Sequence, residues 1–166
     1  MVSHLFSTKS TYLFTLFNHL DHAVTRFTFH HLLHPKNALE EMIRVTKPNG
    51  KIIVADATPT KLNQNKYNEY EKLRDPSHTI ALTHDELISL GNNNSSIIRS
   101  QVIDFKLKYD AESLIDRAFP ETVTHKELLE LLTNDIGKNV IGFSPILEGK
   151  KLKIFFPITA VCWQKV

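Results

Sequence analysis

Residues 35–57 read PKNALEEMIRVTKPNGKIIVADA, and this stretch decides the fold. Its first part repeats apolar residues at helical spacing, with acids near the start and bases near the end, which predicts an amphipathic helix starting at Pro35. Pro48-Asn49-Gly50 predicts a turn that ends this helix. Residues 51–57 form an apolar run up to Asp56, which is typical of a strand buried on both faces of a parallel sheet.

The segment before this stretch predicts a further strand. Residues 22–30, HAVTRFTFH, are rich in β-branched and aromatic side chains. A strand, a helix and a buried strand in succession make a βαβ unit, whose crossover is expected to be right-handed. The sequence therefore predicts an α/β fold.

The rest of the chain predicts four helices and two strands. The helices are expected at residues 61–73, 85–90, 111–118 and 124–135, and capping boxes introduce the second and the fourth. The strands are expected at residues 97–109 and 151–163. Apolar and polar residues alternate in the first, which predicts an edge or antiparallel strand. Pro157 predicts a bulge or an edge position in the second. Because no long linker interrupts the sequence, residues 1–166 are expected to form a single domain.

Composition excludes several classes of protein. The chain has 42% hydrophobic and 23% charged residues and a formal net charge of +2, which fits a folded soluble domain and gives no sign of nucleic-acid binding. The single cysteine, Cys162, excludes an intramolecular disulfide framework and fits a reducing compartment. No stretch suggests secretion or membrane spanning. We therefore expect a cytoplasmic protein with no membrane and no nucleic-acid partner.

Three patterns, in this order, carry a resemblance. They are DHAVTRFTFHH at residues 21–31, ALEEMIRVTKPNG at 38–50 and KIIVAD at 51–56. The series resembles the C-terminal half of class I S-adenosylmethionine-dependent methyltransferases, especially the small-molecule type that includes quinone-biosynthesis enzymes. EKLRDPSH at residues 71–78 looks like a further signature of one subgroup. Asn49 stands where the family has a glycine, and asparagine also tolerates the left-handed conformation.

The resemblance implies a doubly wound, Rossmann-like sheet of seven strands in the order 3-2-1-4-5-7-6, with the last strand antiparallel. This chain would supply strands four to seven and their flanking helices, a truncated and mostly parallel form of that sheet. Residues 22–30 would be strand four, and their outer edge would be unpaired. Since exposed edges invite pairing with another chain, we expect a homodimer or a partner chain at this edge.

The resemblance also implies S-adenosylmethionine as cofactor. In the family, a glycine-rich turn after strand one lets the backbone approach the cofactor closely. The sequence has five glycines, and no two stand at the spacing of such a loop. We therefore expect that this chain does not hold the cofactor in the family's manner and does not methylate on its own.

Candidate cofactor-side residues follow from the resemblance. Arg26, Phe27 and His30 fall where strand four of the family ends, near the methionine half of the cofactor. Packing and surface capping are the alternative roles of these side chains. His30, His31 and His34 also form an H-H-x-x-H pattern, but Pro35 pushes His34 out of helical geometry, so no metal site is predicted.

Candidate substrate-side residues are Arg74, Asp75, Ser77 and His78. They combine a planar cation, an acid, a hydroxyl and a group that titrates near neutrality, which can orient a substrate or move a proton. The resemblance places them beside the pocket of a small-molecule acceptor. The alternative is a turn in which Asp75 caps backbone donors and Arg74 pairs with it.

Three functions remain open at this point. The first is a methyltransferase-like substrate-side half that is inactive alone. The second is an active methyltransferase whose cofactor half comes from another subunit or whose cofactor site is rewired. The third is a non-catalytic module that binds a small ligand. No residue is assigned as catalytic, because methyl transfer depends mostly on positioning.

Overall fold

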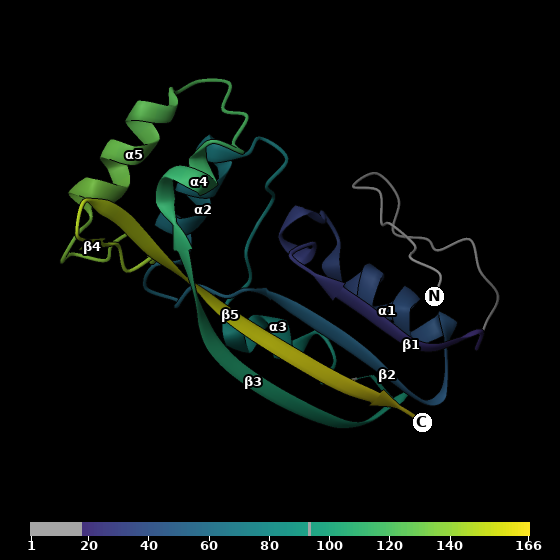
Figure 1. The fold of residues 1–166 in the computed structure, drawn as a ribbon. Coiled ribbons are helices and arrows are strands. Elements are labelled where there is room, and N and C mark those ends of the chain that lie inside the picture. The colour runs from purple at the N-terminus through teal and green to yellow at the C-terminus, as the bar shows by residue number, and fades with distance from the viewer. Residues whose placement is uncertain (1–17, 93) are drawn as a thin grey trace.

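The computed structural model describes residues 18–92 and 94–166, and its centre is a mixed sheet flanked by helices (Figure 1). The strand order is β1-β2-β5-β3, and β4 adds to β5. The strands are β1 (Leu20–Arg26), β2 (Thr46–Ala57), β3 (Ile97–Asp110), β4 (Ile146–Glu148) and β5 (Lys151–Lys165). β1 and β2 are parallel, and β5 is antiparallel to β2, β3 and β4. In the family's numbering this is the expected order 4-5-7-6 with the last strand reversed, so the predicted fold class is confirmed.

The βαβ unit forms as predicted. Helix α1 (Pro35–Val45) carries Pro35 in its first turn, where a missing N–H costs nothing. Asn49 takes a positive φ of 65°, the left-handed conformation that asparagine tolerates. The strand after α1 starts at Thr46 and includes the predicted turn, and its ladder with β1 shifts register between Leu20 and His22.

The prediction for residues 22–30 was wrong at its C-terminal end. β1 ends at Arg26, Phe27 has a positive φ of 52°, and Phe29–His31 form a 3-10 turn. A left-handed conformation is rare for a bulky residue and breaks a strand at once. The chain therefore leaves the sheet four residues earlier than its β propensity suggests.

Pro157 lies in a strand that has neighbours on both sides, so β5 is not an edge strand. Pro157 of β5 pairs with Lys106 of β3, whereas the pairing of β5 with β2 ends one residue later in the chain, at Ile158. The Pro157 carbonyl accepts a hydrogen bond of 2.7 Å from the Thr58 N–H, beyond the end of β2. In an antiparallel strand the N–H and C=O of one residue point to the same side. The N–H that Pro157 lacks would therefore point toward the segment after β2, where the β2–β5 ladder has ended, so no ladder hydrogen bond is lost.

Four further helices follow β2. They are α2 (Gln64–Arg74), α3 (His84–Ser89), α4 (Ala111–Ile115) and α5 (His125–Asn134). The predicted capping boxes, Thr83 with Glu86 and Thr124 with Glu127, both form. α4 is shorter than predicted and ends at Ile115. Within the described ranges no helix has the length and apolar character needed to span a bilayer.

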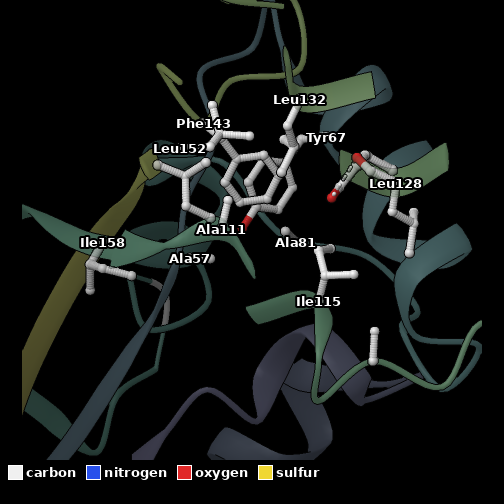
Figure 2. Packing of buried hydrophobic residues seen from close by; sticks show 13 residues of the cluster. Ala57, Tyr67, Ala81, Ala111, Ile115, Leu128, Leu132, Phe143, Leu152 and Ile158 are labelled. Atoms are coloured by element: carbon white, nitrogen blue, oxygen red, sulfur yellow. Dashed lines mark hydrogen bonds between the residues drawn. The ribbon is translucent and has the colours of Figure 1, made fainter. Parts of the chain in front are cut away.

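Two apolar clusters pack against opposite faces of the sheet. One joins α1 and α3 to Ile52, Val54, Val161 and Trp163. The other joins α2, α4 and α5 to Ala57, Ile154 and Ile158, and Figure 2 shows the Tyr67 and Phe143 rings packed at its centre. Figure 1 shows these two groups of helices at different ends of the long, twisted strands β3 and β5. Because side chains alternate along a strand, Ile158 and Val161 of β5 lie on different faces of the sheet.

No helix of the described part of the chain covers one portion of the sheet. Beyond the α2, α4 and α5 group, the same face carries Val24, Ile53 and Cys162 in register across β1, β2 and β5, and it continues to Ile103 of β3, which pairs with Ala160. Val24 and Ile103 are 65% and 66% exposed, and Ile53 and Cys162 are half-buried. We call these four residues the open face. β1 pairs with β2 alone among the described strands, so its outer edge adjoins this open face.

Candidate functional site

Asp56 organises the C-terminal ends of the two parallel strands. It follows the apolar run of β2, is 3% exposed, and accepts the backbone N–H groups of Thr28, Phe29 and His30 at 3.2, 2.7 and 3.3 Å on Oδ2. Its other oxygen, Oδ1, accepts the Ala57 N–H at 2.7 Å. One carboxylate thus holds the turn after β1 against the end of β2, at the edge where ligands bind in open α/β sheets.

His30 is the side-chain partner of Asp56. Its Nδ1 lies 2.5 Å from Oδ1, and the two side chains are 10% and 5% exposed. Burial by itself would lower the pKa of His30, but the hydrogen bond and the charge of Asp56 outweigh burial and raise it. The Nδ1–H therefore donates to Asp56, and Nε2 faces away from the carboxylate.

His31 belongs to a second short chain of hydrogen bonds. Its Nδ1 lies 3.0 Å from the Ser77 hydroxyl, which lies 2.6 Å from Oδ1 of Asp75. An ionised carboxylate only accepts, so Ser77 donates its single proton to Asp75 and Nδ1 of His31 donates to Ser77. Burial and the neighbouring His30 lower the pKa of His31. The ring is thus held neutral with its lone pair on Nε2, the form of a general base.

His78 is buried beside both of these rings. The ring centroids of His78 and His30 are 5.5 Å apart, and those of His78 and His31 are 6.4 Å apart. Nε2 of His78 donates to Oδ1 of Asn68 at 2.7 Å, because this oxygen also accepts the Ala81 N–H. Burial lowers the pKa of His78 to about 4. Its Nδ1 is buried and has no hydrogen-bond partner within the described part of the chain.

An ion pair on α2 lies near the three histidines. Arg74 donates to both oxygens of Glu71 at 2.9 and 2.7 Å, and the side chains are 13% and 4% exposed. Burial opposes the charge of Arg74, but the bidentate contact with Glu71 raises its pKa further. One turn earlier, the Tyr67 hydroxyl is buried without a partner among the residues described. Two orphaned polar atoms, on Tyr67 and His78, cost about 1 to 3 kcal/mol each, which marks this region as a candidate site.

The structure brings the candidate substrate-side residues to one place. His78 and Arg74 are buried or nearly so, whereas Ser77 is exposed. Asp75 caps the Ser77 N–H at 2.9 Å, as a turn would require. Arg74 pairs with Glu71 and not with Asp75, so the pairing expected for the turn alternative was wrong. Whether these residues contact a substrate stays a prediction.

The candidate cofactor-side residues lie at the end of β1. The Arg26 guanidinium stands 4.9 Å from the centroid of the Phe27 ring, in a cation–π contact. The left-handed backbone of Phe27 stores about 1 to 3 kcal/mol of strain, a feature that clusters at functional sites. Nδ1 of His30 is hydrogen-bonded to Asp56. Their role toward a cofactor stays a prediction.

His34 does not join the histidine cluster. It is the exposed N-cap residue of α1 with an extended φ of −131°. Among residues 18–92 and 94–166, no group of three or more His, Cys, Asp or Glu side chains is arranged to hold a metal ion. The neighbouring rings of His30 and His31 are therefore best understood through their hydrogen-bond partners.

Sequence reasoning missed three members of this site. Asp56 was seen only as the acid that ends a buried run, yet an acid at the C-terminal end of a parallel strand was the signal that could have identified it. Glu71 and Tyr67 lie one helical turn apart on α2 and face the same region, which requires the tertiary structure to recognise.

Comparison with known proteins identifies sequences similar to part of this chain. The sequence profile of the family described as "Methyltransferase domain" matches residues 14–54. The demethylmenaquinone methyltransferase of Paenarthrobacter aurescens (strain TC1) is 38% identical over 55 residues, which are 32% of this chain and 22% of that protein. Residues 14–54 are thus similar in sequence to a methyltransferase domain. The curated relative is thus matched over about a fifth of its own length.

Solved structures extend the likeness in fold beyond that segment. The YcgJ protein of Bacillus subtilis is 20% identical with a TM-score of 0.79, and the match covers 93% of this chain and 68% of that one. A putative methyltransferase from Bacillus halodurans C-125 is 18% identical with a TM-score of 0.76, over 93% and 73% of the two chains. The methyltransferase-like fold therefore includes α2 to β5, which the sequence profile does not reach.

Proposed function

We propose that this chain is the acceptor-side half of a small-molecule methyltransferase that uses S-adenosylmethionine. The observation that carries the proposal is the histidine cluster at the ends of β1 and β2, where Asp56 and Ser77 orient the rings of His30 and His31. This edge of the sheet is where a ligand of an open α/β fold binds.

The cluster suits a methyl acceptor that must lose a proton. Nε2 of His31 carries a lone pair in a ring that Asp75, through Ser77, holds in one tautomer. A positioned imidazole of this kind accepts a proton from a hydroxyl or an acidic carbon. His30, whose pKa is raised by Asp56, would supply positive charge beside the anion that forms.

The described residues fit only part of the cofactor. Arg26, Phe27 and His30 offer a cation, an aromatic ring and an imidazole for its methionine half. Two of the glycines allow close packing: a Cβ at Gly50 would lie 2.5 Å from the Asp21 carbonyl oxygen, and one at Gly91 would lie 2.4 Å from Nε1 of Trp163. No glycine-rich cradle occurs among residues 18–92 and 94–166, so we propose that the adenosine half is held by another polypeptide segment.

The outer edge of β1 and the open face are where this segment would join. A strand added beside β1 would pair with its free N–H and C=O groups, and a helix after that strand would cover Val24 and Ile53. Geranyl diphosphate C-methyltransferase of Streptomyces coelicolor A3(2), solved with S-adenosyl-L-homocysteine, matches 94% of this chain over 51% of its own length at a TM-score of 0.57. A second copy of this chain is the alternative occupant of the edge.

The first experiment is calorimetric titration of the purified chain with S-adenosylmethionine and S-adenosylhomocysteine, with its mass in solution measured on the same sample. We expect an associated species that binds neither compound. Micromolar binding, about −8 kcal/mol, by a monomer would contradict the proposal, because the chain would then contain a complete cofactor site.

A further inference from the structure

A second polar group lies on the sheet face that α3 covers, toward the β3 edge. Thr159 of β5 donates to Oδ1 of Asp104 of β3 at 2.6 Å, and the two residues are paired in register. Nδ1 of His84, the first residue of α3, lies 3.0 Å from the same carboxylate oxygen. The Thr58 hydroxyl, just beyond β2, lies 2.7 Å from that of Thr159.

Donor and acceptor roles fix the tautomer of His84. The hydrogen bonds from Thr159 and His84 hold the pKa of Asp104 below its usual value, so the carboxylate is ionised and only accepts. Thr159 gives its proton to Asp104, and Nδ1 of His84 must also donate. Nε2 of His84 is then an acceptor when the ring is neutral. Oδ1 of the exposed Asp85 lies 3.9 Å from this nitrogen, beyond hydrogen-bond distance.

This imidazole opens on a pocket. A hollow of about 390 Å³ is lined by Thr58, His84, Asp104, Phe105, Lys106, Pro157, Ile158 and Thr159. Lys106 is exposed and has no ion-pair partner among the described residues. The residues that line the pocket thus include an imidazole with a free acceptor nitrogen, an ammonium group without an ion-pair partner among the described residues, and the apolar Pro157 ring.

We propose that this pocket binds a small organic anion that carries a hydroxyl group. The hydroxyl donates to Nε2 of His84, and the anionic group pairs with Nζ of Lys106. The ionised Asp104 disfavours a second carboxylate beside the imidazole, so the negative charge of the ligand belongs at Lys106. Asp104 is a positioning residue, because it holds the His84 ring through Nδ1 and leaves Nε2 for the ligand.

The pocket is separate from the histidine cluster of the proposed methyl transfer. None of its lining residues hydrogen-bonds to His30, His31 or His78. It is built entirely by described residues and needs no cofactor and no second chain. A failure of either proposal therefore leaves the other standing.

The test is titration of the full chain with 4-hydroxyphenylacetate, which carries both groups, and with phenylacetate, which lacks the hydroxyl. Binding is followed by NMR of the His84 side-chain nitrogens. We expect saturable binding of the first compound, with a shift at Nε2, and about tenfold weaker binding of the second, which corresponds to 1.4 kcal/mol. H84Q should remove most of the preference for the hydroxylated compound, and K106Q should weaken both.

Two further variants make the test decisive. K126Q removes a surface lysine on α5, far along the chain from the pocket, and should leave both affinities unchanged. D104A should leave the fold intact, because its side chain is 58% exposed, and should replace the single His84 tautomer by a mixture in the nitrogen shifts. Absence of saturable binding, or binding that H84Q and K106Q leave unaltered, would overturn the proposal.

Discussion

Nδ1 of His30 lies 2.5 Å from Oδ1 of Asp56, and the same carboxylate accepts four backbone N–H groups from two separate segments. The contact spans 26 residues of sequence and joins the turn after β1 to the end of β2. Asp56 thus holds the turn after β1 against the end of β2, and it also orients His30, the first histidine of the candidate site.

Replacing Asp56 tests this double role. D56N keeps the size of the side chain but removes the charge and puts an NH₂ group where an oxygen accepts donors. We expect a loss of about 3 to 5 kcal/mol in the free energy of unfolding, the usual cost of breaking a buried, hydrogen-bonded charge pair. Urea unfolding followed by circular dichroism measures it.

D85N is the matched control for D56N. Asp85 is an acid with a side chain 98% exposed, and its substitution should change stability by less than about 0.5 kcal/mol. If both variants unfold at the wild-type urea midpoint, Asp56 does not fasten the two segments.

Helix α2 contains a buried and an exposed ion pair at the same i, i+3 spacing. E71Q leaves the guanidinium of Arg74 buried without its countercharge, and we expect a loss of about 3 to 5 kcal/mol. E69Q breaks the pair with Lys66, whose side chains are 58% and 60% exposed, and should cost less than about 1 kcal/mol. Equal urea midpoints for the two variants would show that burial does not distinguish the pairs.

Several helices and strands could be predicted because local patterns indicate them, whereas the strand order was implied by the resemblance to class I methyltransferases. The apolar run before Asp56, Pro35 at the start of the helix and the capping boxes at Thr83 and Thr124 depend on neighbours a few residues away, and each appears in the structure. A left-handed Asn49 was likewise foreseeable from its side chain.

The end of β1 could not be predicted, because its cause lies elsewhere in the sequence. Residues 27–30 have strong β propensity, but Asp56 accepts the N–H groups of Thr28, Phe29 and His30 and turns these residues out of the sheet. The presence of Pro157 in an interior strand could not be predicted either, because it is tolerated only where the pairing of β5 with β2 has ended. The His84 and Asp104 pocket joins residues 20 apart on different elements, for which no sequence motif exists.

His78 predicts a dependence of stability on pH. Its folded pKa is about 4, below the ordinary value of 6.5, so the unfolded chain binds more protons between these values. The stability contributed by the neutral buried ring is therefore present above pH 6.5 and lost as the pH falls through 6.5 toward 4. His30 acts in the opposite sense: its pKa is raised, so its contribution is present at low pH and lost as the pH rises through its folded pKa.

H78N isolates this effect, because asparagine can still donate toward Asn68 but does not titrate. We expect the difference in urea midpoint between wild type and H78N to shrink as the pH falls from 7.5 to 4.5. Parallel pH profiles for the two proteins would mean that His78 titrates in the folded protein as it does in the unfolded chain, and would contradict a buried, neutral ring.

The open face predicts how the chain associates. Val24 is 65% exposed on β1 and lies across from Ile53, so V24K places a charge on an apolar surface without disturbing the packed face of the strand. We expect V24K to lower the mass in solution from an associated species toward the monomer, because a charge that must be desolvated opposes burial. The urea midpoint should change little. V140K, at a residue 50% exposed in the loop between α5 and β4, should leave the mass unchanged. Equal masses for V24K and the wild type would place any association away from β1, and the edge of this strand would then need another explanation for its apolar surface.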